Sequence, residues 1–385
     1  MGISQLKMPH CTYAGLGSVK NLEQIVKKEG TTSALVFTDK GIKACGLLTP
    51  VTEILEKNDI DYHVFDDLKA EPSYLDVEHV LAEVEKTCGG IIIAVGGGSV
   101  MDAAKLVSVL KGANYTIRDL LENPSLARKQ IPTVMVPTTC GTGAEATCNA
   151  IVAIPEEQSK KGIVNDDMIP DYVILEPKMI ERLPKAIVAA TGVDALAHVV
   201  ECYTSKKATL MSKTFAREGA KLIFANIRKA YEHPEDMEAK EKMMLGAYYG
   251  GIAITASGTT AVHALSYPLG GKYHIAHGVS NAILFAHVME YNKDACEMQL
   301  AELCDAICPE FAEKPSTEKA QYVIDQIADI VRATEIPTNL STFGVKMSDL
   351  DFLVEAGSKQ TRLLVNNRRE LSLDDIRTIY LKVLK

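Results

Sequence analysis

Three histidines lie close together in the segment HALSYPLGGKYHIAHG, residues 263–278. They are His263, His274 and His277, and a proline and two glycines lie between the first and the last of them. His263 is placed near the end of one helical pattern, GTTAVHALSY, and His277 just before another, HGVSNAILFAHVMEYN. The glycine-rich bend between these patterns can bring the imidazoles of two helices together. Neutral imidazole is a common ligand of divalent transition metals.

A carboxylate and a further imidazole occur earlier in the chain, in TGVDALAHVVE. Asp194 and His198 are four residues apart, which places them on one face of a helix. Such a pair is common by chance, and each histidine taken alone is more often a structural residue. Their convergence would form a first shell suited to Fe²⁺ or Zn²⁺, with room for a substrate oxygen. The sequence therefore predicts a metal site from four residues: Asp194, His198, His263 and His277.

A second kind of chemistry is indicated by IIIAVGGGSVMDAAK, residues 91–105. A buried-strand pattern runs into three glycines and Ser99 and then into a helix, whose N-terminus can bind an anion such as a pyrophosphate. The spacing matches neither the G-x-G-x-x-G fingerprint nor a P-loop. A tight strand-to-helix connection without a ligand remains the alternative.

Two more strand ends carry groups compatible with a nucleotide. The segment VPTTCGTGAEAT, residues 136–147, supplies hydroxyls and glycines after a strand, where open α/β sheets bind ligands. Asp39 ends the strand ALVFTD, where a carboxylate can accept from a ribose 2′-hydroxyl and repel a 2′-phosphate, which favours NAD over NADP. The alternative for Asp39 is that it caps the following helix.

The elements that must position these residues divide the chain in two. Apolar, β-branched runs at residues 32–39, 61–67, 89–98, 131–139 and 171–177 alternate with helical patterns, which predicts a doubly wound, mainly parallel α/β sheet. After about residue 180 only helical patterns follow. We therefore expect an α/β dinucleotide-binding domain over residues 1–178 and an all-helical metal-binding and substrate domain over 179–385.

Composition narrows the function classes. The 385 residues are 47% hydrophobic and carry a net charge of −9, which argues against non-specific nucleic-acid binding. No apolar run reaches the ~20 residues needed to cross a bilayer, and the N-terminus lacks the apolar region of a secretory signal. Nine irregularly spaced cysteines argue against a disulfide framework. We expect a cytoplasmic protein without a nucleic-acid or membrane partner.

Together the motifs resemble those of the iron-dependent (group III) alcohol dehydrogenase family. GGGSVMDAAK, PTTCGTGAEAT, GVDALAHVVE and H…HG occur in that family's order and spacing over essentially the whole chain. The resemblance implies a catalytic metal, Fe²⁺ with Zn²⁺ or another divalent ion as alternatives, held by Asp194, His198, His263 and His277. It implies NAD(H) as cofactor and a homodimer or higher homo-oligomer. It also implies nucleotide contacts from Asp39, Gly97, Gly98, Ser99, Asp102, Thr138, Thr139, Thr142, Gly143, Asn149 and Lys160, with Lys161 as an alternative register for the last.

The function that the resemblance implies is the interconversion of a short-chain primary alcohol and its aldehyde. Three departures bear on it. Tyr267 stands where many members carry a relay histidine, so Tyr267 or His274 is the candidate proton relay. Ile254 replaces a pocket aromatic, and Arg362 stands where members often carry a small or apolar residue.

Arg362, with Lys272, could hold an anionic tail on the aldehyde, such as a sulfonate or phosphonate. A salt bridge or a surface position is the alternative for Arg362. Two other functions stay open at this point: a glycerol or diol dehydrogenase, and a non-catalytic nucleotide-binding regulator, which the tyrosine at position 267 would favour.

Overall fold

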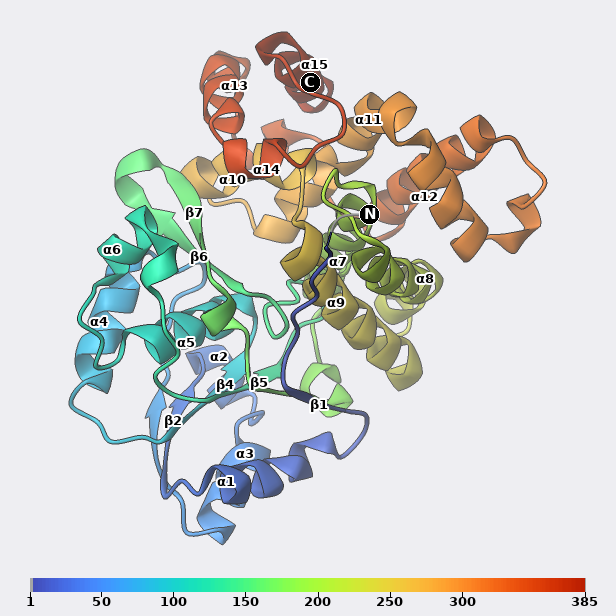
Figure 1. The fold of residues 1–385 in the computed structure, drawn as a ribbon. Coiled ribbons are helices and arrows are strands. Elements are labelled where there is room, and N and C mark those ends of the chain that lie inside the picture. Colours follow the sequence, from blue (N-terminus) through green and yellow to red (C-terminus); the bar gives the residue numbers. More distant parts are fainter. Residues whose placement is uncertain (1–2, 385) are drawn as a thin grey trace.

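The computed structural model describes residues 3–384, which form a sheet-containing half and a helical half (Figure 1). The first half holds a six-stranded sheet in which every pair of neighbouring strands is parallel, in the order β1-β8-β5-β4-β2-β3. The strands are β1 (Cys11–Ala14), β2 (Ser33–Phe37), β3 (Asp61–Phe65), β4 (Ile91–Gly96), β5 (Thr133–Pro137) and β8 (Tyr172–Leu175). The predicted α/β fold class is confirmed, with β1 as an edge strand that the sequence did not predict.

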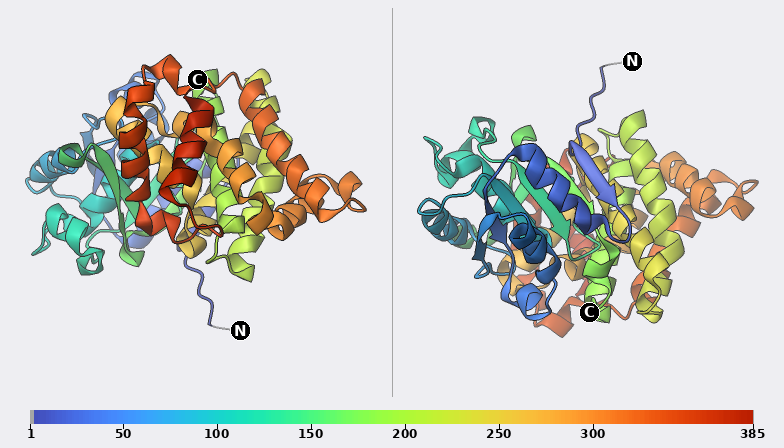
Figure 2. Two further views of the ribbon diagram at one scale, coloured as in Figure 1. Left: turned by 90° about the horizontal axis from the view of Figure 1, so that it is seen from above. Right: turned by 90° about the horizontal axis from the view of Figure 1, so that it is seen from below.

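The central strands are apolar at successive positions because both faces of the sheet are covered. In β4, Ile91 and Ile93 pack with one set of helices, and Ile92 and Ala94 pack on the opposite face. Seen from below, the first helices lie across one face of the sheet, with the helical half beside it (Figure 2). The helices of this half are α1 (Leu22–Glu29), α2 (Lys40–Ala44), α3 (Thr49–Lys57), α4 (Tyr74–Val84), α5 (Gly98–Leu110) and α6 (Ile117–Glu122).

A two-stranded antiparallel hairpin, β6 (Asn149–Ile154) and β7 (Ser159–Val164), was also missed by the sequence analysis. It extends from the sheet half toward α10 (Ala261–Tyr273) of the helical half (Figure 1). The approach is close, because a Cβ atom on Gly271 would stand 2.4 Å from the carbonyl oxygen of Gln158. The hairpin therefore forms a bridge between the two halves.

The helical half is built around α7 (Lys185–Thr204), which packs against its neighbours in the largest apolar core. This helix is long and apolar enough to span a membrane, contrary to the expectation that no such segment exists, but 78% of its apolar window is buried inside the protein. It is therefore a core helix. The other helices are α8 (Leu210–Glu232), α9 (Met237–Ser257), α10, α11 (His277–Ile307), α12 (Ser316–Ala333), α13 (Leu350–Ser358), α14 (Thr361–Leu364) and α15 (Leu373–Val383).

Candidate metal and nucleotide site

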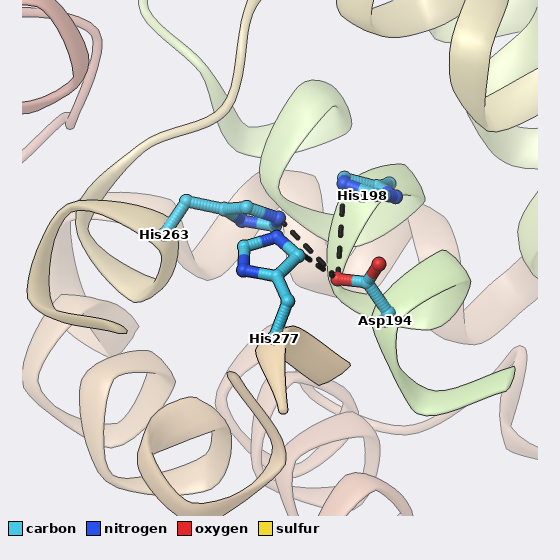
Figure 3. A group of neighbouring side chains, drawn as sticks. All are labelled: Asp194, His198, His263 and His277. Atoms are coloured by element: carbon cyan, nitrogen blue, oxygen red, sulfur yellow. Dashed lines mark ion pairs between the residues drawn. The ribbon is translucent and has the colours of Figure 1, made fainter. Parts of the chain in front are cut away.

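Three helices bring the four predicted metal ligands together (Figure 3). Asp194 and His198 lie one turn apart on α7, and His277 is the first residue of α11. His263 lies in the first turn of α10, whereas the sequence pattern had placed it near the end of a helix. The error arose because the helix continues through Pro268 to Tyr273.

The four side chains face one carboxylate oxygen. The Nε2 atoms of His198, His263 and His277 lie 3.8, 3.5 and 3.7 Å from Oδ1 of Asp194. One ligand atom from each residue lies within 4.8 Å of all the others. This donor set, three imidazoles and one carboxylate, fits Fe²⁺ or Zn²⁺. Of the four, His277 has the most exposed side chain, so the cluster is accessible from one side.

The pKa values of the four side chains are shifted by burial and by their mutual charges. Burial alone would raise the pKa of Asp194, but the three histidines outweigh it and lower the pKa well below its ordinary value. Burial lowers the pKa of His277 to about 3 and also lowers that of His198, which keeps both rings neutral at physiological pH. Burial has the same effect on His263, but Glu201 and Asp194 outweigh it and raise its pKa to about 9. A cation that binds His263 therefore displaces a proton.

Glu201 orients His263 from behind. Its Oε2 contacts Nδ1 of His263, and its Oε1 accepts from the Thr260 amide (3.1 Å), the Thr260 hydroxyl (2.6 Å) and the Val262 amide (2.8 Å). A carboxylate in this position fixes the ring so that Nε2 points to the cluster. The sequence analysis missed Glu201, although it lies one helical turn after His198 in GVDALAHVVE. A buried amide, Asn281, adds a 2.7 Å hydrogen bond to Oδ1 of Asp194.

A cavity of 520 Å³ joins this cluster to the glycine-rich turn. Ser99 lies in the first turn of α5. The neighbouring Gly98 packs tightly against the loop that follows β5, because a Cβ atom on Gly98 would stand 2.7 Å from the Thr142 side chain. Thr138, which lies outside the cavity lining, has a buried Oγ1 without a hydrogen-bond partner within residues 3–384. The lining includes the cluster and six of the predicted nucleotide positions: Gly98, Ser99, Asp102, Thr142, Asn149 and Lys160. Thr147, which was not predicted, also lines the cavity.

The two lysines of β7, Lys160 and Lys161, differ in burial. Lys160 is 6% exposed and lines the cavity, whereas Lys161 is exposed and pairs with Glu157. Alternation along the strand turns only one of them inward. The predicted register at Lys160 is therefore the one that faces the cavity.

Five predicted nucleotide positions are outside this lining: Asp39, Gly97, Thr138, Thr139 and Gly143. Asp39 caps α2, with Oδ1 accepting from the Ile42 amide at 2.9 Å, so the capping alternative is present in the structure. Gly143 has φ +61°, and a Cβ there would stand 2.7 Å from Gly251. Its lack of a side chain serves the contact between the turn and α9.

Of the three predicted catalytic residues, two line the cavity and one does not. Tyr267, 5% exposed, and Arg362 both line the cavity, as does Ile254. His274 does not: it is the exposed C-cap of α10, with φ 55°, so the structure does not bring this predicted relay to the site.

Lys272 is also outside the cavity lining. Its ammonium pairs with Asp349 at 3.3 Å and lies 4.1 Å from the ring centroid of Phe352. The structure therefore does not bring Lys272 into the cavity beside Arg362, because Asp349 and Phe352 contact its ammonium instead.

Comparison with known proteins agrees with this geometry. Residues 9–177 match the model for iron-containing alcohol dehydrogenase, and residues 188–384 match the C-terminal model of the Fe-containing alcohol dehydrogenase family. The chain is 33% identical over 383 residues to long-chain-alcohol dehydrogenase 1 of Geobacillus thermodenitrificans, covering 99% of this chain and 96% of that protein. It is 31% identical over 369 residues to sulfoacetaldehyde reductase of Bilophila wadsworthia, with 94% of each covered.

A solved structure extends the likeness. Sulfoacetaldehyde reductase from Bifidobacterium kashiwanohense, in complex with NAD⁺, superposes with a TM-score of 0.89 and 26% identity, covering all of both chains. The relatives are dehydrogenases and reductases, and this protein is likewise an NAD-dependent alcohol dehydrogenase or aldehyde reductase with a divalent metal, iron in its family, as cofactor. The chain belongs to the iron-containing alcohol dehydrogenase family.

Proposed function

We propose that the protein interconverts a short primary alcohol and an aldehyde whose far end carries an oxyanion such as a sulfonate or phosphonate. The observation that carries this proposal is the position of Arg362, which lines the same cavity as the Asp194 cluster. Its guanidinium is a fixed fork of donors that suits tetrahedral oxyanions. The name of the Bilophila relative, sulfoacetaldehyde reductase, is consistent with such a substrate.

The surroundings of Arg362 leave its charge available. It lies on the short helix α14, and its Nη2 would stand 2.8 Å from a Cβ on Gly162, so the guanidinium rests on a strand position without a side chain. No carboxylate among residues 3–384 forms an ion pair with it, in contrast to Lys272. Inside the cavity it interacts with Tyr267, whose pKa it lowers against the larger, opposite effect of burial.

In this proposal, different residues hold the metal, orient its ligands and exclude water. Asp194, His198, His263 and His277 would hold the metal, with Glu201 orienting His263. When bound, the metal supplies Lewis acidity toward the substrate oxygen, and the nicotinamide carries the hydride. The side chains around the cavity exclude water from the reacting atoms.

Tyr267 is the proposed proton donor in the direction of aldehyde reduction. It is buried, and its ring centroid lies 6.0 Å from that of His277. Because burial raises its pKa above the ordinary value, its hydroxyl keeps its proton at neutral pH and can release it only to a strongly basic oxygen.

Three further features accompany this proposal. A domain boundary near residue 178 fits the end of β8 at Leu175 and the start of α7 at Lys185. A homo-oligomeric state and a cytoplasmic location stay predictions.

Kinetics of Arg362→Ala test the substrate class. The kcat/KM for sulfoacetaldehyde or phosphonoacetaldehyde should fall about 100-fold, because two or so charge-assisted hydrogen bonds are lost, while that for propanal should change less than about threefold. Arg362→Lys should give an intermediate value. Lys359→Ala, which removes a nearby exposed cation paired with Glu355, is the matched control. An unchanged preference in Arg362→Ala refutes the anionic substrate.

A further inference from the structure

A glutamate absent from the predicted site occupies an unusual position in the cavity wall. Glu71 lines the cavity and has φ 53°, a conformation that residues with a side chain seldom adopt. Such a conformation persists only where neighbouring groups hold it. The next residue, Pro72, is tied to the hairpin, because its carbonyl accepts from the Ala153 amide at 3.0 Å.

Glu71 makes two polar contacts, and the partner in each is a residue predicted to bind the nucleotide. Its amide donates to Oγ of Ser99 at 3.0 Å, at the start of α5. Its Oε1 forms an ion pair with Nζ of Lys160 at 2.7 Å, on β7. Glu71 thus joins the glycine-rich turn to the hairpin across the cavity.

Lys160 has little room to find another partner. A Cβ on Gly270 would stand 2.8 Å from its Nζ, so the ammonium is packed against α10. Lys160 lines the same cavity as the four metal-facing residues. The Glu71–Lys160 pair therefore lies in the wall of the cavity that joins the phosphate turn to the cluster.

The cofactor changes charge at this end of the cavity. Hydride transfer requires the nicotinamide ring to lie beside the cluster that holds the substrate oxygen, and the ring is a cation in NAD⁺ but neutral in NADH. An unpaired ammonium nearby would disfavour the cationic ring.

We propose that Glu71 is a specificity-determining residue that offsets the charge of Lys160 and so sets the relative affinity for oxidised and reduced cofactor. This inference rests on the proposed function of the cavity, in which the nicotinamide would lie between the metal-facing residues and the predicted nucleotide residues, Lys160 among them. It does not depend on which aldehyde the enzyme uses.

Calorimetric titration of the metal-loaded enzyme with NAD⁺ and with NADH, without any aldehyde, tests the inference. In Glu71→Gln the ratio of the NAD⁺ to the NADH dissociation constant should rise about tenfold, the effect of one partly screened charge at close range. Glu71→Gly removes the carboxylate and also adopts a positive φ without strain. It should show the same rise while retaining the thermal stability of the wild type.

Two controls make the outcome decisive. Glu157→Gln removes the exposed partner of the adjacent Lys161, 2.5 Å away, and should leave the ratio unchanged. Lys160→Met should lower the ratio below that of the wild type. An unchanged ratio in both Glu71 variants, or equal weakening of both cofactors, would overturn the proposal and leave Glu71 as a loop-holding residue. Unchanged binding in Lys160→Met would instead show that this lysine is remote from the nicotinamide.

Discussion

Replacing Glu145 with glutamine should remove a pH-dependent loss of stability that is built into the turn between β5 and β6. The Glu145 side chain is buried, with the residue 2% exposed, and burial raises its pKa from 4.5 to about 7. A backbone hydrogen bond and, after it, the charge of Lys105 lower the pKa, but neither outweighs burial. Because the folded state holds this proton more tightly than the unfolded state, the wild type loses stability as the pH rises from about 4.5 through 7.

The size of the effect follows from the shift. The difference between 4.5 and about 7 is about 2.5 pKa units, which corresponds to about 3 kcal/mol at most. Most of this difference develops between pH 5 and pH 8. Glu145→Gln has no ionisation there, so its advantage over the wild type should grow by about 2 kcal/mol across that interval.

Urea denaturation in the presence of a chelator, at intervals from pH 5 to pH 8, measures this advantage without a contribution from metal binding. Glu145→Leu provides the matched variant: its absolute stability will differ, since it forms no hydrogen bonds, but its pH trend relative to the wild type should equal that of Glu145→Gln. A constant difference between wild type and Glu145→Gln over this range would refute the argument from burial.

Three further perturbations have defined outcomes. Asp39→Gly should raise kcat/KM for NADPH at least about tenfold, because it removes a carboxylate that repels the 2′-phosphate. Asp39→Asn can still cap α2 at the Ile42 amide, so it separates the effect of the charge from that of the cap. Equal use of NADH and NADPH by the wild type would contradict the preference for NAD. Glu201→Ala should lower the free energy of unfolding by about 3 kcal/mol or more, measured by denaturation, because buried donors of Thr260 and Val262 lose their acceptor. Chelation should abolish turnover and lower the Tm, with both restored by Fe²⁺ or Zn²⁺, since a ligand at 1,000 times its Kd adds about 4 kcal/mol of stability; an unchanged Tm would show that the cluster binds no metal.

The sequence predicted those parts of the molecule that local patterns encode. The five apolar runs became strands because a parallel sheet covered on both faces needs continuous apolar segments. The Asp194 and His198 pair came together because helical periodicity fixes that spacing.

The remainder depends on long-range packing. The hairpin from Asn149 to Val164 has a weak strand signal and is stabilised by its contacts with α10 and the sheet half. Glu71 and Arg362 reach the cavity only through the fold, and His274 points away because the backbone turns left-handed at the end of α10. Spacing within one segment could not predict these directions.

The placement of the four metal-facing residues has a consequence for how the helical half unfolds. Asp194 belongs to α7, whereas His263 and His277 belong to the consecutive helices α10 and α11, so a shared ion cross-links α7 to a distant pair of helices in the way that a disulfide joins distant segments. Loss of the ion should therefore increase hydrogen exchange first in the N-terminal turns of α10 and α11, which carry His263 and His277, before the sheet is affected.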